Sequence, residues 1–322
     1  MYQYPPPQYY APPPPRIPRT IPGVRWSFVG LVLVIGYFAT LAVAAVVMGA
    51  AVAGLPASPS ISQILSALAL AIVFGIVAVI LGILVLVFYL IGVGYLYGGR
   101  NEFGPAHARN VRIAFILLLV AISLGLASGV AQFILASSVF TITGFSITFN
   151  PGTFYALVVV GIVMGIFVAA FMAAHLVLSI RALARPQHQI VLNAAAALGT
   201  ATPGIAGAIT LLQMPRVVAA MQALADSATG GFFTGLPTID PSWGLPAALG
   251  GILSIAAMFL FLFVFRDVNR RLFGGELKPI LPPPQPVTPW MNAPVLVPGP
   301  PGPASPPPTV PWPQAPPPGS SP

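Results

Sequence analysis

Six apolar stretches, each about long enough to cross a lipid bilayer as a helix, alternate with short gaps along this chain of 322 residues. They cover residues 27–53, 64–97, 111–137, 154–180, 190–213 and 247–265. A transmembrane helix needs about 20 mainly apolar residues. Hydrophobic residues make up 57% of the chain and charged residues 6%, whereas soluble domains carry about 25% charged residues. The pattern predicts an all-α integral membrane protein with six transmembrane helices.

Basic residues gather in every second gap between these stretches. Of the 13 lysines and arginines, only Arg216 lies in one of the other gaps. Because Arg and Lys are enriched in cytoplasmic loops, the sequence predicts an N-in/C-in protein of the cell (plasma) membrane, with the bilayer as its main partner. This placement also explains the net charge of +8. A nucleic-acid partner is therefore not needed to account for the positive charge, and none is predicted.

Both ends of the chain are rich in proline. Residues 1–24 contain nine prolines and four tyrosines, and residues 276–322 contain twenty prolines. Proline fixes φ and lacks an N–H group, so such runs stay extended as polyproline II. We expect two disordered cytoplasmic tails around a transmembrane domain of residues 25–275. Pro6–Tyr9 (PPQY) matches a WW-domain ligand, although chance produces such a match in a tail of this composition.

The second apolar stretch is too long for one crossing. Residues 64–97 would extend about 50 Å as a helix, against a hydrocarbon core of about 30 Å. Either the helix projects beyond the membrane or it bends at one of its glycines. We favour projection at the cytoplasmic end, where Tyr95 and Tyr97 are suited to the membrane interface.

Two features are predicted on the outer side. Residues 139–152 (VFTITGFSITFNPG) alternate polar and apolar side chains around Gly144, which predicts a β-hairpin lying on the helices or the membrane. Residues 215–228 begin with a proline and place apolar residues at helical spacing. They predict a short amphipathic helix at the interface.

Small residues suggest where helices pack. Gly125 and Gly129 form one GxxxG pair, and Gly161 and Gly165 form another. Such pairs let helix backbones approach closely, here within one chain rather than between two copies. Pro203 should kink the fifth stretch, which is the least hydrophobic of the six and is expected inside the bundle.

Polar groups inside the apolar stretches are few. No Asp, Glu, Lys or Arg occurs in their central parts, and His175 is their only histidine. Asn193 lies at a similar depth on the next, antiparallel stretch, so the two side chains form a candidate hydrogen-bonded pair. The alternative is a site that handles protons or solute, because intramembrane ionisable groups are often functional.

No catalytic, cofactor or metal site is predicted. The chain has no cysteine, and it lacks phosphate-binding loops, nucleophile elbows and HExxH helices. His107 and His188 have no second ligand at metal spacing. Activity as an enzyme therefore has little support.

The loop between the second and third stretches, residues 99–111, reads GRNEFGPAHARNV. It resembles a segment of multi-pass integral membrane proteins of archaea, in which Gly-Arg-x-Glu-Phe-Gly followed by His and Asn-Val joins two spans. That family has no known activity, so the resemblance implies a six-span plan alone.

Glu102 is expected to form a salt bridge with Arg100 or Arg109 or to contact lipid headgroups. The candidates for contact with lipid headgroups are Arg100, Arg109, Arg112, Arg270 and Arg271.

Two functions are consistent with this sequence. The first is a structural or interaction role in which the polyproline tails recruit protein partners. The alternative is a transporter or channel for a neutral or apolar solute, since the Pro-containing fifth stretch is similar to the interrupted helices that line transport paths. A water-lined cavity beside Asn193, Thr200 and Thr202 would favour transport, whereas a dry, fully packed bundle would exclude it.

Overall fold

The computed structural model describes residues 18–53, 61–143, 146–229 and 244–280. Most of both proline-rich tails, the Pro6–Tyr9 motif and the loop before the last helix lie outside these residues.

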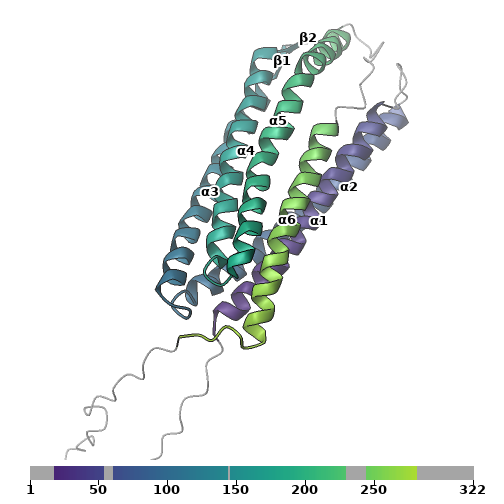
Figure 1. The fold of residues 1–322 in the computed structure, drawn as a ribbon. Coiled ribbons are helices and arrows are strands. Elements are labelled where there is room, and N and C mark those ends of the chain that lie inside the picture. Colours follow the sequence, from purple (N-terminus) through teal and green to yellow (C-terminus); the bar gives the residue numbers. More distant parts are fainter. Residues whose placement is uncertain (1–17, 54–60, 144–145, 230–243, 281–322) are drawn as a thin grey trace, which may run out of the picture. The chain divides into compact units, whose positions relative to one another are not determined.

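Six helices and one hairpin follow each other in the described part of the chain (Figure 1). The helices are α1 (Thr20–Ala53), α2 (Ile61–Gly98), α3 (Pro105–Ser137), α4 (Pro151–Ile180), α5 (Pro186–Thr229) and α6 (Leu245–Phe273). All six are long and apolar enough to cross a bilayer. The prediction of a mainly α-helical chain with six such helices is therefore confirmed, and the helices suggest a multi-pass membrane protein.

The helices extend beyond the apolar stretches that predicted them. Helix α1 begins at Thr20 rather than near residue 27, and α6 continues to Phe273 rather than ending near residue 265. Hydropathy marks only the apolar part of a helix, and in α6 the arginines of the last turn, which are good helix formers, continue the helix into polar sequence. Helix α2 is a single helix of 38 residues that continues through its glycines.

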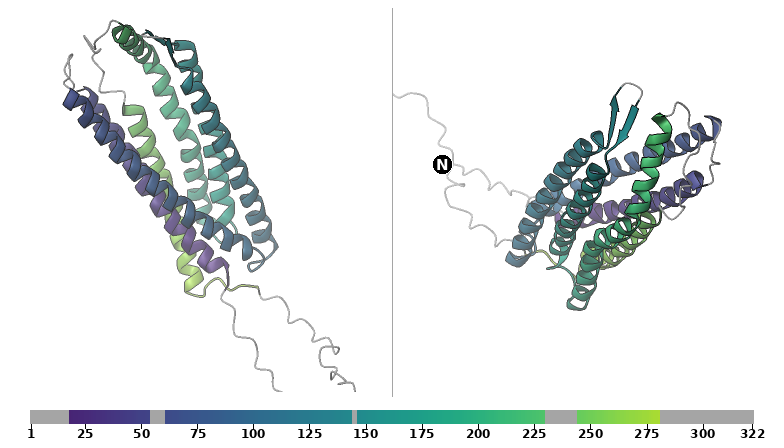
Figure 2. Two further views of the ribbon diagram at one scale, coloured as in Figure 1. Left: turned by 180° about the vertical axis from the view of Figure 1, so that it is seen from behind. Right: turned by 90° about the horizontal axis from the view of Figure 1, so that it is seen from above.

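The largest departure from the prediction concerns α5. The expected fifth span at 190–213 and the separate amphipathic helix at 215–228 form one helix of 44 residues, with Pro203 and Pro215 inside it. A proline removes one backbone hydrogen bond, and neighbouring helices can compensate for this loss. Consistent with such support, Met214 is buried. The last turns of α5 run at an angle to the rest of the helix (Figure 2).

The predicted hairpin is present. Strand β1 (Phe140–Thr143) pairs with β2 (Ser146–Phe149) in antiparallel register, with Phe140 opposite Phe149. Val139 and Phe149 pack against Ala225 near the end of α5. The hairpin therefore lies on the helices, which supply the apolar partner that an isolated hairpin lacks.

The six helices pack side by side in the order α2, α1, α6, α5, α4, α3, and α2 and α3 make few contacts with each other (Figures 1 and 2). Helices α1, α3 and α5 begin at one end of the bundle, where α2, α4 and α6 finish. We call this the basic end and the opposite one the hairpin end. The described basic residues at or near the basic end are Arg19, Arg25, Arg100, Arg109, Arg112, Arg181, Arg185, Arg266, Arg270, Arg271 and Lys278.

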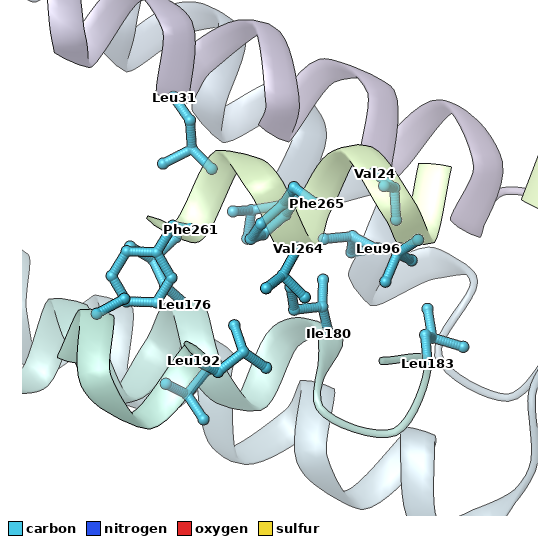
Figure 3. Packing of buried hydrophobic residues seen from close by; sticks show 14 of the residues in the cluster. Val24, Leu31, Leu96, Leu176, Ile180, Leu183, Leu192, Phe261, Val264 and Phe265 are labelled. Atoms are coloured by element: carbon cyan, nitrogen blue, oxygen red, sulfur yellow. The ribbon is translucent and has the colours of Figure 1, made fainter. Parts of the chain in front are cut away.

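A hydrophobic core near the basic end holds the two sides of the bundle together (Figure 3). Phe261, Val264 and Phe265 of α6 are at most 1% exposed and lie at its centre. Leu31 of α1 contributes from one side and Ile180 of α4 from the other. Helix α6 therefore joins α1 and α2 to α4 and α5.

Glycines permit close contacts of α1 with its neighbouring helices, and Gly92 and Gly251 are two examples. A Cβ atom on Gly92 of α2 would lie 2.5 Å from the backbone N of Ser27, and one on Gly251 of α6 would lie 2.8 Å from Cβ of Ala42. Neither glycine belongs to a predicted GxxxG pair. Close packing against α1 thus depends on positions that the sequence motif did not identify.

Candidate functional site

A cavity of about 540 Å³ lies between α1, α2 and α6 on one side and α3, α4 and α5 on the other. Every one of the six helices contributes to its wall. On α4 the lining residues extend from Gly161 to Leu176, which corresponds to about 22 Å along the helix axis. The cavity is therefore elongated along the helices.

The cavity is narrowed at its basic end by the hydrophobic core. Leu31, Leu176 and Phe261 line it there and are themselves at most 2% exposed. Figure 3 shows Phe261 next to Leu176, with Leu31 on a third helix, and all three belong to one core cluster. Because they also belong to the core that joins the helices, this end of the cavity is bounded by the hydrophobic core.

The glycines predicted to pack helices line the cavity. No atom of another residue would come within 4 Å of a Cβ atom on Gly125 or Gly129, so this pair makes no close helix contact. A Cβ atom on Gly161 would lie 3.6 Å from Gln132 Nε2, and one on Gly165 would lie 3.5 Å from Cβ of Pro203. The structure therefore brings Gly165 and Pro203 together, while the missing side chains of Gly125 and Gly129 widen the cavity.

Few polar groups line the cavity, and none of the lining residues is charged. Gln132 and Ser128 lie one helical turn apart on α3, and Gln132 Nε2 donates a hydrogen bond to Ser128 Oγ at 2.9 Å. Tyr89 of α2 and Ser254 of α6 also line the cavity with polar side chains, and sequence analysis identified neither of them. The spacing of Ser128 and Gln132 places them on one face of a helix, but only the fold reveals that this face borders a cavity.

The cavity is partly open on the side of α2 and α3. Gly129 lines it and is also exposed, and Val85 and Gly125 line it while half-buried. Tyr97 and Phe115 stack with ring centroids 4.7 Å apart close to the loop that joins α2 to α3. The two helices thus meet at the basic end and leave the wall open farther along.

The predicted hydrogen bond between His175 and Asn193 is absent. His175 is 2% exposed, and its Nδ1 lies 2.7 Å from the carbonyl oxygen of Ala114 on α3. Asn193 is exposed on α5, because Leu192 beside it faces the core and successive helical residues are turned by about 100°. His175 instead ties α4 to α3, and its ring meets that of Tyr89 edge-on at 5.7 Å.

The predicted headgroup contacts divide into two groups. Arg109, Arg112 and Arg270 are exposed at the basic end. Arg271 is used within the protein, since its Nη1 donates to the carbonyl oxygen of Leu183 at 2.9 Å and its Nε pairs with Glu276 at 3.3 Å.

Arg100 also has a partner within the protein. Its Nη1 donates to the carbonyl oxygen of Tyr97 at 2.9 Å, and its guanidinium lies 4.4 Å from the centre of the Tyr97 ring. The loop that follows α2 thus folds back on the end of that helix.

Glu102 has a role that sequence analysis missed. Instead of pairing with Arg100 or Arg109, its carboxylate oxygens accept hydrogen bonds from the backbone N–H groups of Arg19 (2.7 Å) and Thr20 (2.9 Å). A carboxylate is stabilising there because the first N–H groups of a helix lack partners and carry partial positive charge. No local pattern reveals this cap, since the partners are more than eighty residues apart.

The other two histidines occupy different surroundings at the basic end. His107 is buried beside Phe103, and neither of its ring nitrogens has a hydrogen-bond partner among the described residues. His188 Nδ1 lies 3.2 Å from Asp267 Oδ2, and Arg185 lies 3.7 Å from the same oxygen. Among the residues that the structure describes, no three His, Asp or Glu side chains could together hold a metal ion.

No protein family, curated protein or solved structure matches this chain. The resemblance of residues 99–111 to archaeal membrane proteins therefore stays an expectation.

Proposed function

We propose that this chain is a carrier for a neutral, largely apolar solute, embedded in the cell (plasma) membrane. The cavity of about 540 Å³ supports this function most directly. Binding sites for small molecules typically enclose about 300–1,000 Å³ and are mainly apolar with a few polar groups. The cavity fits this description, although it lies beside Pro203 rather than beside Asn193.

The wall of the cavity favours a neutral solute. A charged solute in an apolar site needs a partner of opposite charge or extensive hydrogen bonding, and no lining residue is charged. The side chains of Leu31, Leu176 and Phe261 narrow the basic end, which favours a carrier over an open channel. The open side at Gly129 would admit a solute from the bilayer.

A photoreactive long-chain alkane carrying a diazirine tests this proposal. The full chain is placed in lipid nanodiscs with a trace of the probe, irradiated and digested for mass spectrometry. We expect labels to concentrate on cavity residues such as Gln132 and Met164 and to fall when unlabelled alkane is added. Labels confined to outward-facing residues such as Phe133 and Ile134, unaffected by competitor, would overturn the proposal.

We further propose that the basic end faces the cytoplasm, with both termini on that side. The described basic residues other than Arg216 lie at or near this end, and cytoplasmic loops are enriched in such residues. The arginines exposed there, among them Arg109, Arg112 and Arg270, would contact lipid headgroups.

Single cysteines give a direct measurement of orientation, because the natural chain has none. Asn101→Cys lies in the loop at the basic end and Thr141→Cys in the hairpin, and both positions are exposed. On intact cells we expect an impermeant maleimide to label Thr141→Cys and to label Asn101→Cys only after the membrane is opened. The reverse pattern would show that the orientation is wrong.

A second candidate function is recruitment of partners by the two proline-rich tails. It is favoured by one observation, namely that both tails begin at the same loop. Glu102 accepts hydrogen bonds from Arg19 and Thr20 through its side chain, and its backbone oxygen accepts from the N–H of Ile280 at 2.7 Å. When two tails start next to each other and one of them binds a partner, the other tail is held near the same partner at a raised effective concentration.

Deleting the tails separates the two candidates. A chain of residues 18–280 should keep its alkane labelling, because every cavity residue lies within it, but should lose partners that co-purify with the full chain. Partner capture that survives the deletion would exclude recruitment by the tails.

A further inference from the structure

We propose that the solute is a neutral single-chain amphiphile, whose hydrocarbon chain fills the cavity lengthwise and whose one hydrogen-bonding group meets Gln132. This inference rests on the proposed solute-binding function and specifies its substrate class. It follows from the shape of the cavity, the position of its polar groups and the absence of charge.

The shape fits one extended chain. The lining residues follow α4 for about 22 Å, from Gly161 to Leu176, yet the volume is only about 540 Å³. A long and narrow apolar space suits a single hydrocarbon chain better than a compact ring system. At the deep end the wall is formed by Leu31, Leu176 and Phe261 together with Tyr89, which packs beside Gly30.

The hydrogen-bonded pair of Gln132 and Ser128 lies toward the opposite end. Gly161 is the first cavity residue of α4 when counted from the hairpin end, and Gln132 faces it at a distance of 3.6 Å from the position of a Gly161 Cβ. Because Gly161 has no side chain, the space in front of the Gln132 amide stays open. A molecule bound lengthwise would therefore place one of its ends against this amide.

Gln132 has hydrogen-bonding capacity to spare. Its amide group has two N–H donors and one carbonyl acceptor, and one donor is used by Ser128 Oγ. Among the described residues, no other group bonds to the Gln132 amide. Unpaired polar groups in an apolar environment cost free energy, and a hydroxyl group could satisfy both a remaining donor and the acceptor.

The lack of charge selects among possible end groups. A carboxylate or phosphate at this position would have no cationic partner, since no lining residue is charged and burial of an unpaired ion is costly. An alcohol or a neutral ester would lose little by leaving water. The class of ligand is therefore a long-chain alcohol or a comparable neutral lipid, and not a fatty acid.

Competition against the alkane photoprobe tests this specificity. Unlabelled long-chain alkane, alcohol and carboxylic acid of equal length compete for labelling of the full chain in nanodiscs. We expect the alcohol to compete at about tenfold lower concentration than the alkane, as two modest hydrogen bonds would give. Gln132→Met, which roughly conserves volume, should remove this preference while alkane labelling persists, and Gln187→Met at the exposed basic end should leave it unchanged.

The outcomes distinguish the two levels of the proposal. If alcohol and alkane compete equally well on the natural chain, the proposal of an amphiphilic solute is overturned. The proposed function as a carrier for an apolar solute would still stand. Competition by the acid at the alcohol's concentration would overturn the requirement for a neutral end group. Failure of the alkane to label the cavity at all would instead overturn the proposed function.

Discussion

Gly129→Phe should reduce labelling of the cavity by the alkane photoprobe at least about tenfold. A Cβ atom at this position would meet no other residue within 4 Å, so the new ring would enter open space at the partly open side of the cavity. A phenylalanine side chain removes volume without displacing the helix backbone. We therefore expect loss of binding without loss of folding, measured as labelling and as thermal unfolding in the same nanodiscs.

Gly75→Phe is the matched control. Gly75 of α2 also has no neighbour within 4 Å of a Cβ atom, but it is exposed and does not line the cavity. The same substitution there should leave labelling unchanged. Equal loss of labelling in both variants would show that the effect comes from the protein's stability or its lipid contacts, and the assignment of the cavity as the binding site would be wrong.

The helices and the hairpin could be predicted from the sequence because their causes are local. A run of apolar residues suffices to identify a helix able to cross the bilayer, and alternation around Gly144 identified the hairpin that β1 and β2 form. The predicted end of the fifth span, at residue 213, was wrong because that prediction also relied on a local signal. Proline is a local signal for a break, yet α5 continues through Pro203 and Pro215. Whether a membrane helix continues through a proline depends on the helices packed around it, which local sequence does not show.

The candidate site could not be predicted in the same way. Hydropathy treats a helix face toward lipid, toward another helix and toward a cavity alike, because all three are apolar. Gly125 and Gly129 match a packing motif, yet they border a cavity. Gln132 shares a helix face with these two glycines, but the spacing does not reveal what this face borders. Glu102 caps a helix more than eighty residues away. These positions acquire their roles only from the three-dimensional arrangement.

Gly92→Ala should lower the thermal stability of the protein substantially. The added Cβ would lie 2.5 Å from both N and Oγ of Ser27 and 3.0 Å from its Cα, so α1 and α2 would have to separate. Overpacking of this kind typically costs about 1–3 kcal/mol. Gly75→Ala on the same helix is the control, because it meets no neighbour and should be neutral or stabilising by up to about 1 kcal/mol through helix propensity.

The same clash determines whether a second substitution can rescue the first. Ser27→Gly removes the Oγ atom but leaves the backbone N at 2.5 Å from the added Cβ, so Gly92→Ala combined with Ser27→Gly should regain only part of the lost stability. Full rescue in thermal unfolding would show that side chains alone set the distance between the helices. Separation of α1 from α2 also displaces Leu31 and Tyr89 in the cavity wall. We therefore expect Gly92→Ala, unlike Gly75→Ala, to weaken alkane labelling together with stability.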